Sequence, residues 1–503
     1  MEAEFAMTNR RRYLFVPILG TLFAAIAFWY FSSDPDAPKR HWPELQAAAE
    51  STTPVAVRVG PNVHVSVNDI REKYWECVLA CDPSDSLKQY GAAMLMRADP
   101  QRDIVAFYSR DGGMSWQEAL HKVCPDGHAF NDPTIAVGPD GTAYLAYMDV
   151  DQDASSSKEN LGSLVFLASS DGGKTWEARS RHSNYVDRPW LAVDTLSSQY
   201  RGRVYCLGQT EPRDPSGEIT HAEPILLVSE DRLATLSEER NPHQGRQMLN
   251  CRPAGPVVFS DGTVMLAYMD QYLKRRIRGW PRPAIYIATT SDGGLSFEDQ
   301  APVNTRWWHD HVSSSPNSSA GAEFPQLAVD TESRFAERVY CVWSDGEELH
   351  DATRIFFSFS VDRGRSWSQP VTLSEQPLTE SGDQSYSSWM PTISVNKNGV
   401  VAVSWYDRRG LPGTRTEPLP DGNGLMRTVS EGWNVRLRVS TDGGATWQPS
   451  VELNEQPGQG GIHVGHTAGL AAAPDGRFHA SWIDNRTGEN EIWTASILVE
   501  EVP

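Results

Sequence analysis

An octapeptide of the form Ser-x-Asp-Gly-Gly-x-Thr/Ser-Trp recurs along the chain and constrains its fold more than any other feature. Its copies, from the clearest to the most degenerate, are Ser109–Trp116, Ser169–Trp176, Ser440–Trp447, Thr290–Phe297, Ser360–Trp367 and Ser229–Leu236. The Asp residues of successive copies lie 60, 60, 61, 70 and 80 residues apart. Such a period is typical of stacked supersecondary units that cannot bury their own apolar faces. Within each copy, glycines permit positive φ and Asp accepts hydrogen bonds from turn amides, which predicts a tight hairpin turn.

A second repeat alternates with the octapeptide and marks where each unit begins. It is a proline followed by a short apolar strand, and its copies start at Pro133, Pro189, Pro253, Pro325 and Pro391. Ala468–Ala472 is a further copy, and Cys77–Cys81 is a weaker first one. Two more strands follow each opening before the octapeptide is reached. Short, evenly spaced strands with one aromatic motif per unit indicate an all-β fold, a β-propeller of four-stranded blades.

Seven strand openings favour seven blades, whereas the six octapeptides keep six blades as the alternative. The last unit has no octapeptide and therefore no fourth strand of its own. We expect Val63–Val67 to supply that strand and to close the ring.

The N-terminus carries a second strong pattern, a long uncharged segment behind a basic cluster. Arg10–Arg12 precedes Tyr13–Phe31, and these 19 uncharged residues match the span of a bilayer. We therefore predict a cytoplasmic segment (1–12), a transmembrane signal-anchor helix (13–31), a linker (32–54) and the propeller (55–503), which would lie on the periplasmic or extracellular side. A cleaved signal peptide is the alternative.

Composition limits the partners of the propeller. The formal net charge is −20 and the pI is about 5.1, which argues against binding to nucleic acid or to anionic membrane surfaces. The spacing of the six cysteines does not indicate a disulfide framework, although one disulfide between Cys81 and Cys124 stays an alternative. Nothing in the sequence calls for a cofactor.

Propeller topology indicates where chemistry can take place. The octapeptide turns lie at one face of the ring, so the starts of the inner strands lie at the opposite face, around the mouth of the axial channel. The residues expected there are Asn131, Asp132, Asp187, Arg188, Cys251, Arg252, Glu323, Phe324, Trp389, Met390 and His466. Carboxylates and arginines that converge on one concave site suit glycoside chemistry or anion recognition. For any single Asp at a strand end, capping of the next turn is the alternative role.

The octapeptides resemble Asp boxes, also called bacterial neuraminidase repeats, and Trp405–Arg409 and Trp482–Arg486 resemble the same family. From about residue 75 to 500 the chain is similar to the sialidase superfamily. This resemblance implies a propeller that removes terminal sialic acid from a glycan. It also implies three arginines for the substrate carboxylate, an Asp as acid/base, and a Tyr nucleophile activated by a Glu.

By position, the resemblance assigns the carboxylate-binding role to Arg188, Arg252 and either Arg408 or Arg409. Asp132 or Asp187 would be the acid/base, Tyr406 or Tyr386 with Glu323 the nucleophile pair, and Trp389 a further substrate-binding residue. In sialidases the arginine of the first inner strand stands one residue earlier relative to the proline, and a one-residue slip turns a strand's side chain to the other face. Asp boxes themselves specify the fold and not the activity.

Two other features lead to different function classes. His309 and His311, with His463 and His466, form a candidate metal site for a hydrolase if their loops meet. Tyr272–Trp280 is a basic, aromatic insertion that suits an acidic glycan or a protein partner. A non-catalytic propeller that binds a glycan or a protein is therefore the main alternative to a glycosidase. Arginines that converge beside a carboxylate would favour the enzyme.

Overall fold

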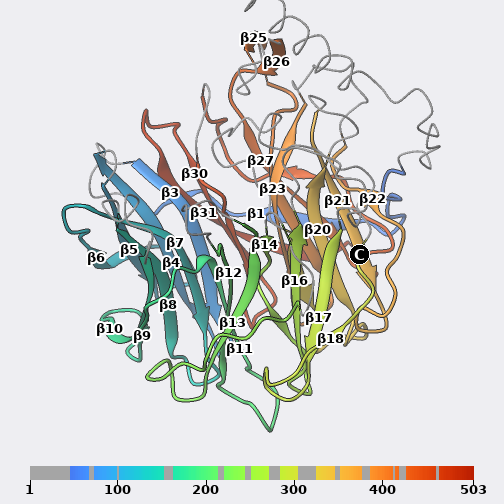
Figure 1. Ribbon diagram of the computed structural model, residues 1–503. Helices are drawn as coiled ribbons and strands as arrows, with labels where there is room; N and C mark the ends of the chain where they lie inside the picture. Colours follow the sequence, from blue (N-terminus) through green and yellow to red (C-terminus); the bar gives the residue numbers. More distant parts are fainter. Residues whose placement is uncertain are drawn as a thin grey trace, which may run out of the picture. The chain divides into compact units, whose positions relative to one another are not determined.

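Seven antiparallel sheets are arranged as the blades of a propeller in the computed structural model (Figure 1). The structure describes residues 46–66, 73–98, 101–151, 162–212, 220–243, 248, 251–270, 284–303, 325–345, 352–375, 386–411, 414–418, 426–459 and 464–502. The seven-bladed prediction is confirmed, and the six-bladed alternative is excluded. The predicted membrane segment Tyr13–Phe31 falls outside these ranges, within which no helix is long and apolar enough to cross a membrane.

Each blade runs from an inner strand outward in chain order. Blade 1 contains β3 (Lys73–Asp82), β4 (Asp85–Ala98), β5 (Gln101–Ser109) and β6 (Gln117–Lys122). Blade 2 contains β7 (His128–Val137), β8 (Ala143–Asp151), β9 (Gly162–Ser169) and β10 (Glu177–His182). Blade 3 contains β11 (Asp187–Val193), β12 (Val204–Thr210) and β13 (Glu223–Ser229). Blade 4 contains β14 (Cys251–Pro253), β15 (Val257–Val258), β16 (Val264–Asp270), β17 (Ile285–Thr290) and β18 (Glu298–Asp299). Blade 5 contains β19 (Gln326–Val329), β20 (Val339–Asp345), β21 (Arg354–Ser360) and β22 (Val371–Thr372). Blade 6 contains β23 (Ser388–Val395), β24 (Val401–Asp407), β27 (Asn434–Ser440) and β28 (Val451–Glu452), with the hairpin β25 (Thr414–Pro418) and β26 (Met426–Ser430) inserted after β24.

The ring closes through the N-terminal strands, as the repeat count predicts. Blade 7 contains β29 (Gly469–Ala472), β30 (Phe478–Asp484) and β31 (Glu491–Glu501), and β1 (Val55–Val59) and β2 (Val63–His64) both pair with β31. Most of the closing strand thus lies before the expected Val63–Val67. The residues just before β1, expected in the linker, also reach the blades: the amide of Ala48 donates to the Thr372 carbonyl at 2.9 Å, and the amide of Trp447 donates to the Ala49 carbonyl at 2.9 Å.

The octapeptide turns share one hydrogen-bond pattern. In the second copy, the Asp171 carboxylate accepts from the Thr175 amide at 3.0 Å and from the Thr175 hydroxyl at 2.8 Å, while Ser169 Oγ donates to the same carboxylate at 2.9 Å. The degenerate copy keeps this pattern around Asp231 without glycines, because Arg232 and Leu233 take up positive φ values of 60° and 65°. The backbone of the turn is therefore more constant than its sequence.

Strand pairing places the two ends of the channel as expected. The start of β7 pairs with the end of β8, through His128 and Asp151, whereas the start of β8 pairs with the end of β9, through Ala143 and Ser169. The octapeptide after β9 consequently lies at the face opposite the start of the inner strand.

All six cysteines are free thiols, so the open Cys81–Cys124 pair is not formed. Cys206 and Cys341 occupy the same place in their blades, opposite Leu191 and Leu327 of the inner strands, and both are buried. They act as small apolar packing residues.

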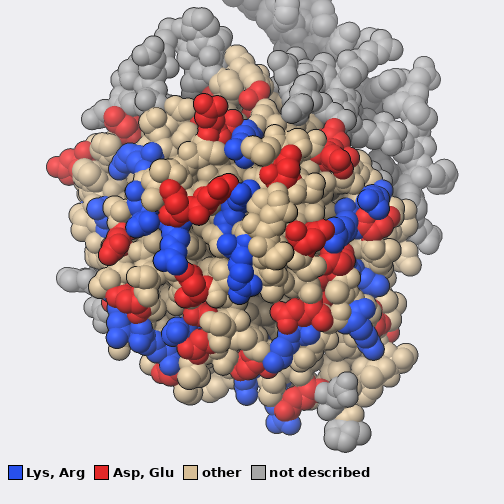
Figure 2. Space-filling view, turned by 90° about the horizontal axis from the view of Figure 1, so that it is seen from below, with Lys and Arg blue, Asp and Glu red and all other residues tan. Residues whose placement is uncertain are grey.

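Charges of both signs are mixed on the face of the molecule that Figure 2 shows from below. Lys and Arg are interspersed there with Asp and Glu, with no broad field of one sign. Ion pairs join neighbouring charges in the structure, for example Arg363 and Asp261 at 2.7 Å. The net charge of −20 is therefore not gathered on this face.

Candidate functional site

A β-bulge at the start of the inner strand recurs in four blades and positions the site. The pairing shifts register at this point in β3, β7, β11 and β23. In each bulge one non-glycine residue has a left-handed backbone: Glu76 (φ 56°), Asp132 (φ 50°), Arg188 (φ 55°) and Met390 (φ 54°). A residue before proline is disfavoured in the right-handed helical region, and a non-glycine at positive φ is itself uncommon and marks functional sites. The extra residue of a bulge re-aims a side chain, so the one-residue offset in the sequence does not by itself decide which side Arg188 faces.

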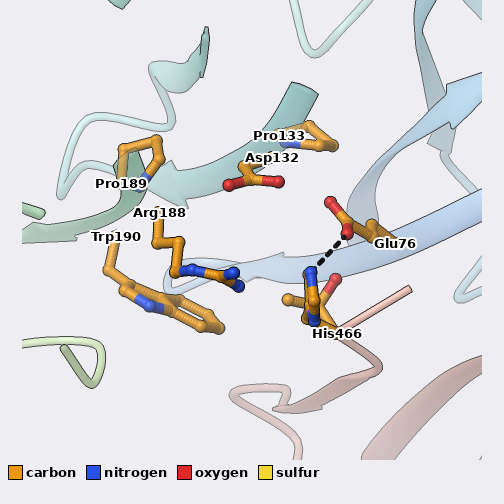
Figure 3. A pocket seen from close by; sticks show the side chains of 8 residues that line it. Glu76, Asp132, Pro133, Arg188, Pro189, Trp190 and His466 are labelled. Carbon is orange, nitrogen blue, oxygen red and sulfur yellow. Dashed lines mark ion pairs between the residues drawn. The ribbon is translucent and has the colours of Figure 1, made fainter. Parts of the chain in front are cut away.

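Three of these bulge residues meet in one pocket. Its walls come from Glu76, Asp132, Pro133, Arg188, Pro189, Trp190, His466 and Thr467, and the space free of protein atoms among them, open solvent included, is about 270 Å³. Figure 3 shows the Glu76, Asp132 and Arg188 side chains pointing toward one another, with the Trp190 ring beside Arg188. The pocket is therefore assembled from blades 1, 2 and 3 together with the segment that precedes β29 of blade 7.

Two carboxyl groups share the centre of this pocket. Glu76 and Asp132 hydrogen-bond to each other. Burial raises the pKa of Glu76 well above its ordinary value, and the charge of Asp132 raises it further. Burial, followed by the charge of Asp187, raises the pKa of Asp132 from 3.8 to about 6. Two carboxylates this close cannot both be ionised at low cost, so the pair keeps a shared proton to higher pH than an isolated carboxyl group would.

Arginines offset part of this negative charge. Arg188 Nε lies 3.3 Å from Asp187 Oδ2, and the charges of Asp187, Asp132 and Glu76 raise the pKa of Arg188 against the effect of its burial. Burial, followed by the charge of Arg188, lowers the pKa of Arg252 to about 9. Arg188 and Arg252 are thus electrostatic neighbours with Asp187 beside them. Two adjacent buried guanidinium groups favour an anion between or beside them.

A polar extension leads away from the pocket along blade 3. Gln209 Nε2 donates to Asp187 Oδ2 at 3.1 Å and to Glu211 Oε1 at 3.3 Å. The charge of Asp187 raises the pKa of Tyr185, and burial and the charge of Glu211 raise it further. Tyr185 is therefore a neutral phenol at physiological pH, surrounded by hydrogen-bond acceptors.

The two arginines assigned as alternatives from the sequence, Arg408 and Arg409, directly follow β24 of blade 6. Arg408 is buried and its guanidinium lies 5.7 Å from the centre of the Trp389 ring. Arg409 pairs with Asp407 and with Glu375, each at 3.0 Å. Arg486 repeats the pairing with Asp484 in blade 7, so the Trp-x-Asp-x-Arg motifs brace their strands.

The two tyrosines assigned from the sequence differ in environment. Tyr406 is fully buried, and its hydroxyl donates to the Ile483 carbonyl at 3.1 Å and accepts from the Ile483 amide at 2.9 Å. Burial raises the pKa of Tyr406 well above its ordinary value. Tyr386 lies in the turn just before β23. Neither tyrosine lines the pocket that contains Asp132 and Arg188.

The remaining assignments involve Glu323 and the histidines. Glu323, His309, His311 and His463 lie outside the described residues. His466 lines the pocket, where its Nε2 lies 3.5 Å from Glu76 Oε1 (Figure 3). Within the described ranges, no group of three or more His, Cys, Asp or Glu side chains is arranged to hold a metal ion.

Sequence reasoning missed Glu76 and Trp190. Glu76 is followed by Cys77 where five of the other units have proline, so the proline marker that identifies Asp132 and Arg188 is absent. The weak copy of the strand repeat at Cys77–Cys81 was the signal that could have located it. Trp190 follows the proline of β11, a position that is filled by small or polar residues such as Thr134 and Thr392 in other units.

Comparisons with known proteins find one repeat family and several distant structural likenesses. The BNR/Asp-box repeat family matches residues 107–118 and 438–449, and no curated protein matches the chain. A solved protein of unknown function from Dyadobacter fermentans shares 13% identity, covers 89% of this chain and 99% of its own, and has a TM-score of 0.47. An α-L-arabinanase from Penicillium chrysogenum shares 14% identity, covers 88% of this chain and 98% of its own, and has a TM-score of 0.42. An intramolecular trans-sialidase from Ruminococcus gnavus shares 12% identity, covers 85% of this chain and 94% of its own, and has a TM-score of 0.42.

At these identities and TM-scores, the structural likenesses say nothing about activity. Any assignment of an activity therefore depends on the pocket itself. The protein is a seven-bladed β-propeller with BNR/Asp-box repeats that resembles sialidase and arabinanase structures.

Proposed function

We propose that this protein is a glycoside hydrolase that acts on a terminal sugar bearing a carboxylate, sialic acid or a related acidic sugar. The observation that carries the proposal is the proton-sharing Glu76–Asp132 pair with Arg188 in one pocket, with Arg252 as the electrostatic neighbour of Arg188. An acid that retains its proton near pH 6 can protonate a glycosidic oxygen, and paired arginines bind a sugar carboxylate.

In this proposal Glu76 and Asp132 act as one acid/base unit. Because the two groups hydrogen-bond to each other, they are closer than the roughly 5–5.5 Å that separates the two carboxyl groups of ordinary retaining glycosidases, and closer than the roughly 6.5–9.5 Å of inverting ones. They therefore cannot stand on opposite sides of a scissile bond. Asp132 faces Asp187 and Arg188, so we assign proton donation to Asp132 and the storage of the shared proton to Glu76.

A tyrosine is the group that we propose to test first as nucleophile. Tyr185 lies among Asp187, Glu211 and Asp132, which are the electrostatic neighbours that perturb its pKa. A neutral phenol avoids repulsion from the substrate carboxylate, and Glu211 or Asp187 would accept its proton during attack. Tyr185→Phe should then abolish turnover, whereas Tyr406→Phe should act through stability.

The test is hydrolysis of a fluorogenic sialoside by the isolated propeller. We expect Arg188→Lys and Arg252→Lys to lower kcat/KM by about 10–100-fold, because a lost charge-assisted hydrogen bond is worth about 1.5–3 kcal/mol. Arg181→Lys is the matched control, since Arg181 pairs with Asp149 at 2.8 Å outside the pocket. If no carboxylate-bearing glycoside is cleaved but a glycan or a protein binds through the pocket face, the protein is a binding module and the enzyme proposal fails.

We also propose that the propeller is exported and anchored by Tyr13–Phe31, whose uncharged run follows three arginines. Alkaline carbonate extraction of membranes from expressing cells should leave the protein in the pellet. A soluble product with a new N-terminus beyond Ser32 would indicate a cleaved signal peptide instead.

A further inference from the structure

His466 stands out because blade 7 brings it to the carboxyl pair across the seam where the ring closes. Its Nε2 lies 3.5 Å from Glu76 Oε1, and both side chains are largely buried, with 14% and 5% of their surface exposed. Glu76 uses its carboxyl group at the same time to hydrogen-bond to Asp132. An imidazole, a glutamic acid and an aspartic acid are thus placed in a row that ends in the pocket (Figure 3).

The backbone holds this row in place. The amide of Glu76 donates to the Val464 carbonyl at 2.9 Å, which ties β3 of blade 1 to the segment that carries His466. Gly465, between these residues, has a φ of +87°, and a Cβ there would lie 2.1 Å from Glu76 Cγ. Only glycine fits this close approach, so the local sequence is built around contact with Glu76.

We propose that His466 is a positioning residue for the shared proton of the Glu76–Asp132 pair: it fixes the outer oxygen of Glu76 and, when protonated, favours ionisation of the pair. This inference deepens the proposed function and rests on it for its catalytic meaning. The other charged groups that face the pair are Asp187 and Arg188 from β11 and Arg102 from β5. The proton that Asp132 gives to a leaving group is replaced from Glu76, that of Glu76 from protonated His466, and His466 regains its proton from solvent.

The direction of the effect follows from the charges. An imidazolium stabilises the ionised pair, so its removal lets the pair keep its proton to higher pH. A unit charge 3.5 Å away shifts a titration by about one pH unit even at the dielectric constant of water. His466→Gln retains an N–H donor but cannot become charged, so it separates the charge from the hydrogen bond.

The experiment uses the carbonyl stretch of the protonated carboxyl pair, measured by infrared spectroscopy without substrate as the difference between the wild type and Glu76→Gln. In His466→Gln this band should persist to about one pH unit higher than in the wild type. His128→Gln is the matched control, because His128 Nδ1 lies 2.7 Å from Asp149 at the start of β7, away from the pocket. A band that disappears at the same pH in His466→Gln and the wild type overturns the inference, as does an equal shift in His128→Gln.

A second measurement needs no histidine variant to fold. In ¹⁵N-histidine NMR spectra of the wild type, the His466 resonance should show a second inflection where the carboxyl pair titrates, and Glu76→Gln should remove it. A single inflection in both proteins contradicts the inference. If glycoside hydrolysis is found, its alkaline limb should move with the infrared band in His466→Gln. If no hydrolysis is found while the band still moves, the proton coupling stands and only the proposed function fails.

Discussion

Replacing Asp132 by Asn should make the propeller more stable at neutral and alkaline pH, because the wild type keeps an acid where burial and Asp187 oppose its ionisation. The raised pKa of Asp132, about 6 against 3.8, corresponds to about 3 kcal/mol at about 1.4 kcal/mol for each tenfold change in the ionisation constant. The native state binds more protons than the unfolded state between these two values. Wild-type stability from this group is therefore complete below pH 3.8 and is lost as the pH rises through about 6.

The assay is urea-induced unfolding of the wild type and Asp132→Asn at several pH values from 4 to 8. We expect nearly equal free energies of unfolding at pH 4 and an advantage of about 3 kcal/mol for the variant at pH 8, together with loss of any hydrolytic activity. Asp171→Asn serves as a control of opposite sign, because turn hydrogen bonds lower the pKa of Asp171 to about 2, so its carboxylate stabilises the fold above pH 3.8. A difference between the wild type and Asp132→Asn that stays constant from pH 4 to 8, or that turns in favour of the wild type, would refute the reasoning.

Three further predictions concern packing, close approach and thiols. Trp447→Ala should lower the free energy of unfolding by about 3–5 kcal/mol, because Trp447 is fully buried and packs edge-on against Phe357. Trp176→Ala should lower it by less, because Trp176 is only half-buried. Equal losses of the two variants in urea titrations would contradict this prediction. Gly465→Ala should abolish turnover by displacing Glu76, whereas Gly488→Ala, with a φ of +107° and no atom near its Cβ, carries a similar backbone strain and should leave turnover unchanged. Burial raises the pKa of the Cys77 and Cys206 thiols to about 12, so a thiol reagent at pH 7.5 should modify them only after unfolding, and rapid labelling of the native protein would show that they are accessible.

The fold could be predicted from the sequence because most blades repeat two local patterns, the octapeptide turn and the proline before the inner strand. Even the degenerate turn at Asp231 was recognisable, since its Asp and Thr235 retain the hydrogen bonds that shape it. Asp132, Arg188 and Arg252 were found from the same repeat, because topology alone brings the starts of inner strands to one face.

The details of the site depend on backbone geometry that the repeat does not encode. The bulge in β11 that re-aims Arg188 requires a positive φ at a residue that normally avoids it, so spacing alone suggested the wrong side of the strand. Glu76 stayed hidden because Cys77 replaces the marker proline. The partner of Glu76, His466, lies 390 positions away in the chain, and only closure of the ring brings the two together.

The pairing of β1 with β31 has a consequence for how the chain is made. Arg58 on β1 bonds to Glu500 on β31, 442 positions later, so the first strand has no partner until nearly the whole chain exists. At a synthesis rate of roughly 5–20 residues per second, that interval is roughly 20–90 s. During it, β1 presents an unpaired edge and the blade 1 to blade 7 seam is open, so Glu76 and His466 cannot meet. Nascent or C-terminally truncated chains should therefore be aggregation-prone and inactive, and assembly of the pocket should be the last event in folding.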